Sequence, residues 1–258
     1  EALGKVHHDL GEPAEAAKAF AEVLRRAPHH RGARVALIGE LLNSGRSGEA
    51  TAWIAEALRD QPEGVEILGL AARHAYDSGR SEDASALADR TLARDPNNRN
   101  ALLVRAKMRL VSDDPEGARK DLERAVAVNP NDLGALQSLA MVEARLGLKG
   151  RAQETAAMLR KARQRATLMG QLTREITDRP DDPGPRWRMG HAAMEGGQAE
   201  LARRCFQAAL ALDPSCRPAR EGLASLDAEG TGTSPAARRA PRARETSAPA
   251  GSPSSLPD

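Results

Sequence analysis

Apolar and small residues recur along this chain at helical spacing, in stretches of about four turns separated by short polar turns. These stretches alternate along the chain: most of the first, third, fifth and later odd ones are followed by a glycine, and each of the even ones is followed by a proline. Proline cannot continue a helix, and glycine most readily adopts the left-handed conformation that ends one. The pattern therefore predicts helices such as 13–27 and 31–44, joined by short turns into antiparallel pairs.

These boundaries repeat every 34 residues, with one longer interval. The prolines are Pro28, Pro62, Pro96, Pro130, Pro180 and Pro214. The turn glycines are Gly11, Gly45, Gly79, Gly147 and Gly197, with Asp113 as the exception. An alanine follows each turn by five residues, at Ala16, Ala50, Ala84, Ala118, Ala152 and Ala202. A small side chain there allows the two helices of a pair to cross closely.

The unit is written most fully as Met189-Gly190, Gly197, Ala202, Phe206, Ala209-Leu210 and Pro214. This unit resembles a tetratricopeptide repeat, and the resemblance extends over about residues 1–227. It implies an all-α fold, an α-α superhelix of six helix-turn-helix repeats. The family's large aromatic residue in the first helix is replaced here by His7, Leu41, Ala75, Arg109, Glu143 and Ala193.

The repeat register divides the chain into a solenoid and a tail. The repeats are expected at 1–30, 31–64, 65–98, 99–132, 133–182 and 183–216, followed by a capping helix at 217–227. The remainder, 228–258, is rich in Pro, Ser, Ala and Arg and contains one large apolar residue, Leu256. Such a segment cannot bury a core, so 228–258 is predicted to be a disordered tail.

The fifth repeat carries a lengthened second helix. Pro130 and Pro180 are 50 residues apart, and small or apolar residues run through the surplus at spacings of three and four. That stripe favours one helix over 149–178, about 45 Å long. The alternative is a pair of helices that breaks near Gly170. The basic stretch 149–165 is interpreted as a solvated helix face rather than a binding ridge.

Composition narrows the possible functions. Aromatic residues make up 2% of the chain, which disfavours an all-β fold, and no run of 18 apolar residues could span a membrane. The net charge of +2 and the few aromatics argue against nucleic acid as a partner.

Glu1 falls inside the first helix of a repeat, so we expect the C-terminal part of a longer bacterial protein, whose compartment and oligomeric state stay open.

The sequence contains none of the common catalytic motifs. There is no glycine-rich phosphate loop, no Cys-x-x-Cys and no His-Glu-x-x-His. Adjacent histidines on a helix point about 100° apart, so His7-His8 and His29-His30 do not form a chelate by themselves. We therefore expect no catalytic residue, no metal site and no cofactor.

A solenoid of this kind offers a concave surface lined by the first helices. The resemblance implies that partner-binding side chains lie on that face, and the candidates are Lys5, Asn43, Arg73, Tyr76, Asn100, Lys107, Met141, Arg145, Trp187, His191 and Met194. Trp187 could instead pack against the long preceding helix. The asparagine and lysine positions of the chaperone-tail clamp of some family members are not matched.

These observations predict a scaffold that binds a protein or peptide in the concave groove and is not an enzyme. The alternative is an accessory array of a larger enzyme or cytochrome-like protein, with its catalytic domain upstream of residue 1.

Overall fold

The computed structural model describes residues 1–9 and 11–231, and within these ranges every regular element is an α-helix. The helices are α1 (Ala2–Asp9), α2 (Pro13–Arg26), α3 (Arg31–Asn43), α4 (Ser47–Asp60), α5 (Val65–Asp77), α6 (Ser81–Leu92), α7 (Arg99–Val111), α8 (Pro115–Val128), α9 (Leu133–Arg145), α10 (Lys149–Asp178), α11 (Pro183–Glu195), α12 (Ala199–Leu212) and α13 (Arg217–Thr231). The predicted all-α repeat fold is confirmed.

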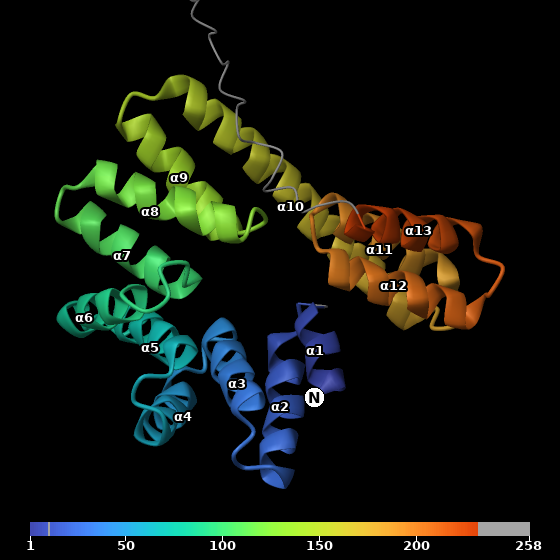
Figure 1. Cartoon of the computed structure of the whole chain (residues 1–258), viewed down its shortest axis with the longest axis horizontal. Helices are drawn as coiled ribbons and strands as arrows, with labels where there is room; N and C mark the ends of the chain where they lie inside the picture. The colour runs from blue at the N-terminus through green and yellow to red at the C-terminus, as the bar shows by residue number, and fades with distance from the viewer. Residues whose placement is uncertain (10, 232–258) are drawn as a thin grey trace, which may run out of the picture.

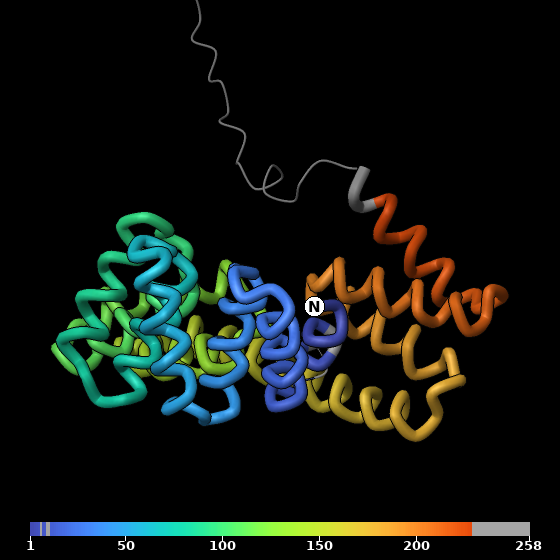
Figure 2. Tube along the Cα trace, turned by 90° about the horizontal axis from the view of Figure 1, so that it is seen from below, coloured from blue at the N-terminus to red at the C-terminus, as the bar shows by residue number. Residues whose placement is uncertain are grey.

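Consecutive helices pair into hairpins that stack into a curved array (Figure 1). The first helices contact each other directly along the stack, since α3 packs on α5 and α5 packs on α7. The array bends far enough that its two ends approach each other in both views (Figures 1 and 2). The first helices α1, α3, α5 and α7 share one face of the curve, and six of the candidate partner-binding residues lie on these four helices.

The turns within the hairpins have the conformation predicted from the sequence. Gly11, Gly45, Gly79, Gly147 and Gly197 all have positive φ, between 71° and 75°. Asp113, which occupies the glycine position in the fourth repeat, has φ 58°. A Cβ atom makes this conformation costly, although Asp tolerates it better than most residues. The fourth repeat therefore keeps the common turn geometry at the expense of some strain.

Replacing Asp113 by Gly is expected to raise the free energy of unfolding by about 0.5–1 kcal/mol, because it removes the strained Cβ. The substitution also removes an ion pair with Arg145, which is exposed and contributes little. Urea titration followed by circular dichroism measures the change. The reciprocal variant Gly79→Asp should lower stability by a similar amount, and a stability gain in both variants would contradict the turn assignment.

Helix α10 is the irregular element of the array. It runs unbroken for 30 residues from Lys149 to Asp178, through Gly170, as the apolar stripe predicts. It packs against α9 on one side and α11 on the other, and so bridges the two parts of the array (Figure 1). The turn before α9 forms hydrogen bonds with the long helix α10 and with the turn after α11. Asn131 Nδ2 donates to the carbonyl of Gly196 at 2.6 Å, and its Oδ1 accepts from Arg165.

Three hydrophobic clusters hold the array together, one spanning α2–α5, one α5–α10 and one α11–α13. In the third cluster Phe206 is fully buried, and two glycines leave room for its ring. A Cβ at Gly190 would lie 2.5 Å from the ring, and one at Gly222 would lie 2.3 Å from it. Gly4 makes room for Phe20 in the same way, at 2.8 Å. Each phenylalanine is thus paired with a glycine on the facing helix.

Helix α13 covers the end of the sixth repeat, where Ala219 and Leu226 are buried in the third cluster. It begins at Arg217, as expected, and continues to Thr231, four residues beyond the predicted end of the cap. Ala228 and Glu229 favour this extension, whereas Gly230 does not, so helix propensity alone does not explain the extra turn at 228–231. The rest of the predicted tail, 232–258, lies outside the described residues.

Candidate functional site: a two-part groove on the first helices

The structure brings six of the predicted partner-binding residues around two adjoining hollows on the first helices. Lys5 (α1), Asn43 (α3), Arg73 (α5) and Asn100 (α7) line a hollow of about 600 Å³. Tyr76 and Lys107 line a second one of about 230 Å³. The two hollows share Asn43, Arg73, Arg99 and Asn100, so they form one continuous surface. We call this surface the groove, the larger part hollow A and the smaller part hollow B.

Hollow A has an apolar wall and a charged rim. Phe20, Val35, Ala36 and Leu70 supply apolar atoms between the helices. The rim combines both signs of charge, from Glu1, Lys5, His8, Glu40, Glu66, Arg73 and Arg99. An apolar depression with a few polar groups at its edge is the usual composition of a peptide-binding surface.

Two carboxylates on the rim of hollow A have a lowered pKa. The pKa of Glu66 is lowered, first by the hydrogen bond from its own backbone N–H and then by Arg31, whose Nη2 donates to its carboxylate at 2.8 Å. The pKa of Glu1 is also lowered, chiefly by a hydrogen bond from Lys5 at 2.7 Å. Glu40 is buried and its carboxylate contacts His8 Nδ1 at 2.5 Å. Hollow A therefore carries fixed negative charges beside its apolar wall.

Hollow B differs in charge. It is lined by three cations, two amides and a phenol, together with Leu103 and Val104, and none of its lining residues is a carboxylate. Lys107 Nζ lies 4.4 Å above the centre of the Tyr76 ring, within the range of a cation–π contact. Arg73 Nη1 donates to Asn43 Oδ1 at 2.9 Å, which ties α5 to α3.

Several residues of the groove were absent from the sequence-based candidates, among them the charged residues Glu40, Glu66 and Arg99. A signal for Glu66 existed, because it lies 34 residues before Asn100 and so occupies the same position in the preceding repeat. Arg99 is the neighbour of Asn100 at the start of α7, and it reaches the groove while its Nε donates to the buried Asp132 at 2.5 Å.

The remaining candidates lie on α9 and α11 and line neither hollow. Met141 is 60% exposed, and Arg145 is engaged with Asp113. Trp187 stacks edge-on against His191 at 5.6 Å, and His191 contacts Phe206 at 5.1 Å.

Trp187 and Met194 are half-buried against the α11–α13 cluster, so Trp187 packs within its own unit. A partner-binding role for the candidates on α9 and α11 stays a prediction.

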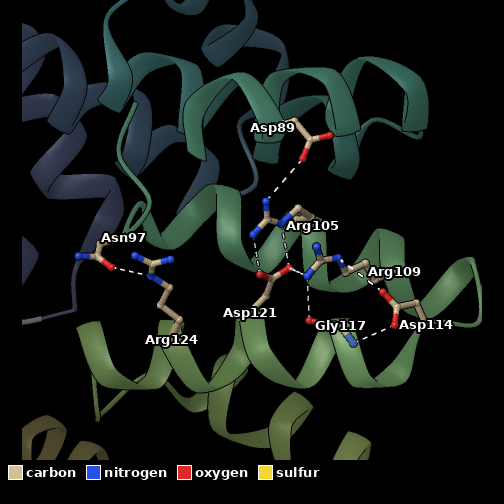
Figure 3. Close-up of polar contacts among 8 residues, drawn as sticks. All are labelled: Asp89, Asn97, Arg105, Arg109, Asp114, Gly117, Asp121 and Arg124. Atoms are coloured by element: carbon tan, nitrogen blue, oxygen red, sulfur yellow. Dashed lines mark hydrogen bonds and ion pairs between the residues drawn. The ribbon is translucent and has the colours of Figure 1, made fainter. Parts of the chain in front are cut away.

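A cluster of charges in the fourth repeat serves packing rather than ligand binding (Figure 3). Asp121 of α8 is buried and accepts hydrogen bonds from Arg105 at 2.9 and 2.7 Å and from Arg109 at 2.7 Å. The Asp121 hydrogen bond is the main cause of the raised pKa of Arg105. Arg109 occupies the position at which the repeat pattern has an aromatic residue. Here its ion pair with Asp121 joins α7 to α8. Glu143 occupies the same position in the fifth repeat, where the Thr155 hydroxyl of α10 donates a hydrogen bond to its carboxylate at 2.7 Å.

Within residues 1–9 and 11–231, no three His, Cys, Asp or Glu side chains converge in a way that could hold a metal ion. Of the helices in this part of the chain, none is both long and apolar enough to cross a bilayer.

Comparisons with known proteins agree with this architecture. The sequence matches the tetratricopeptide repeat family over residues 1–65, 70–113 and 188–245. Comparison with curated proteins gives no match. A chain of the APC/C hetero-tetramer Cut9–Hcn1 superposes with a TM-score of 0.54 and 13% identity over 87% of this chain, which spans 42% of that one.

Two smaller proteins match over nearly their whole length. One is YrrB, described as a TPR protein with an unusual peptide-binding site, with a TM-score of 0.43, 16% identity and coverage of 81% of this chain and 99% of that one. The other is TTC0263, a TPR protein from Thermus thermophilus, with a TM-score of 0.42, 20% identity and coverage of 76% and 97%. At these identities the likeness concerns the fold alone.

Proposed function

Because this chain belongs to the tetratricopeptide repeat family, whose members commonly mediate protein–protein interactions, we propose that it is a non-enzymatic scaffold that binds a peptide in the groove of α1, α3, α5 and α7. The observation that carries the proposal is the continuity of hollows A and B, which share four residues. The other form of ligand that this surface fits is a helix of a partner protein.

The groove suits a peptide because it combines apolar contact with fixed polar partners. Hollow A, at about 600 Å³, has room for more than one side chain of a partner. Its polar groups are held by contacts within the protein, such as Arg73 with Asn43 at 2.9 Å and Arg31 with Glu66 at 2.8 Å. A surface held in this way loses little side-chain entropy when a partner binds.

Replacing Gly39 by Trp is expected to weaken peptide binding at least about tenfold without unfolding the chain. Gly39 lies on α3 at the edge of hollow A, and a Cβ at this position meets no atom within 4 Å. The indole would therefore occupy the space of the ligand rather than disturb the core. The probes are short peptides that have been selected from a random display library for binding to the full chain. Fluorescence anisotropy measures their dissociation constants.

Two matched variants control this experiment. Gly39→Ala adds only a methyl group at the same position and should leave binding within about twofold. Gly150→Trp adds the same indole on α10, where a Cβ also meets no atom within 4 Å, and it lies outside the groove. Selected peptides that bind Gly39→Trp as tightly as the wild type would show that the groove is not the binding site.

A further inference from the structure

We infer that the bound segment carries an acidic side chain which docks in hollow B, next to an apolar side chain in hollow A. This inference rests on the proposed function and adds the chemistry of the ligand. The occupant to which it commits is an aspartate or glutamate of a partner protein, in an otherwise apolar stretch.

The polar atoms that hollow B presents are mostly hydrogen-bond donors. The Asn43 amide oxygen already accepts from Arg73 at 2.9 Å, so the amide NH₂ of Asn43 points away from that contact. The Asn100 amide oxygen likewise faces Arg99 Nη1, at 3.4 Å. Both amides therefore offer donors to a ligand, beside the guanidinium of Arg73 and the ammonium of Lys107. A surface made of donors selects a group that only accepts, and an ionised carboxylate is such a group.

The cations of hollow B are only partly compensated by carboxylates of the protein. Lys107 is exposed, and no carboxylate of the described residues lies within ion-pairing distance of it; its neighbour is the Tyr76 ring. Arg73 has its nearest carboxylate, Asp77, at 3.6 Å, which leaves that guanidinium partly uncompensated. Arg99 is paired with the buried Asp132. Hollow B thus keeps an excess of positive charge that a ligand carboxylate would neutralise.

The two ends of the groove differ in charge, and this difference sets the direction of the ligand. Glu1, Glu40 and Glu66 line hollow A and none of them lines hollow B, so the negative charges lie at one end of the groove. In hollow A these three carboxylates are balanced by Lys5, Arg73 and Arg99, whereas hollow B is lined by cations without a carboxylate, so an acidic side chain is attracted more strongly to hollow B. The apolar wall of Val35 and Leu70 lies in hollow A. A segment with one acidic residue near an apolar residue therefore fits in one orientation only.

The test uses three pools of short fluorescent peptides with acetylated and amidated ends, so that no terminal carboxylate is present. A central position is fixed as Glu, Gln or Lys, and the other positions are drawn from Ala, Leu and Ser. With the full wild-type chain we expect the Glu pool to bind about fivefold more tightly than the Gln pool, and the Lys pool to bind most weakly. Raising the salt concentration should reduce this preference.

The diagnostic variant is Lys107→Glu, because Lys107 is exposed and its removal leaves no buried partner behind. It should abolish the preference for Glu and favour the Lys pool. Lys161→Glu makes the same charge change at an exposed position of α10 outside the groove and should keep the wild-type order. Circular dichroism melts check that both variants fold.

Equal binding of the Glu and Gln pools to the wild type would overturn the inference, as would a Lys107→Glu variant that still prefers Glu. Both results leave the proposed function intact as long as Gly39→Trp blocks binding. In a fourth pool the central position is phosphoserine, and binding of this pool more than about tenfold more tightly than the Glu pool would assign hollow B to phosphate instead. If no pool binds although display-selected peptides bind and Gly39→Trp blocks them, this inference is wrong and the proposed function stands. If the display-selected peptides do not bind either, both are wrong.

Discussion

Replacing Phe206 by Ala is expected to lower the free energy of unfolding of the α11–α13 unit by about 3–5 kcal/mol. The ring is fully buried between α11 and α13, in the cluster that also contains Ala193, Ala219 and Leu226. Each hairpin of a solenoid contacts only its neighbours, so the loss should be local. Hydrogen–deuterium exchange should show faster exchange in α11–α13 and unchanged exchange in α2–α6. Wild-type protection of α12 in the variant would contradict this packing.

The glycine side of the same contact provides the matched control. Gly190→Ala places a Cβ 2.5 Å from the Phe206 ring, so the ring or the helix must shift. Gly39→Ala makes the identical change on α3, where the new methyl group meets nothing within 4 Å, and should stabilise by up to about 1 kcal/mol. The two glycine variants should therefore change the free energy of unfolding in opposite directions. Gly190→Ala combined with Phe206→Ala should cost less than the sum of the two changes, because the Ala side chain leaves room for the methyl group.

Replacing Asp121 by Ala should lower the free energy of unfolding around the fourth repeat by about 2–3 kcal/mol. The carboxylate is 5% exposed and accepts from both Arg105 and Arg109, whose guanidinium groups would lose their shared partner (Figure 3). The two arginines are themselves about one third exposed or less, so water offsets part of the loss. Denaturant titration with hydrogen exchange on α7 and α8 measures the effect.

An exposed aspartate serves as the control for Asp121. Asp83 on α6 pairs with Arg80 at 3.2 Å, but its side chain is 60% exposed. Asp83→Ala should change stability by less than about 0.5 kcal/mol, since exposed ion pairs contribute little. Equal effects of Asp121→Ala and Asp83→Ala would mean that the arginine pair on α7 does not depend on Asp121.

The positions of the helices could be predicted because the sequence signals that set the helix ends act over only a few residues. The turn at Asp113 has positive φ like the glycines in the same position of other repeats, so the turn geometry follows from the register even where the residue differs. The apolar stripe predicted the whole of α10, because a stripe at helical spacing needs no distant partner to define it. The boundary at the end of α13 was less well defined, since the turn-glycine position of the register falls on Thr231 and the neighbouring Gly230 and Gly232 lie out of register.

The candidate site could be predicted only in part. The register placed Arg73, Tyr76 and Lys107 on the concave side, and the structure brings them together around hollow B. It did not bring Trp187 to the same surface, because α10 carries α11 away from the regular stack and Trp187 packs within the last unit (Figure 1). Glu40 and Glu66 were missed, because a list of single positions does not show which side chains border the same hollow.

The sequence by itself determined where helices begin and end, how they pair and which residues face inwards, because proline, glycine and helical periodicity are local constraints. Only the tertiary structure decided how side chains from different repeats combine. Asn43, Arg73 and Lys107 come from three helices, and their polar atoms are oriented by contacts between those helices. The curvature of the stack sets those contacts, and that curvature results from the packing of all the helix pairs together.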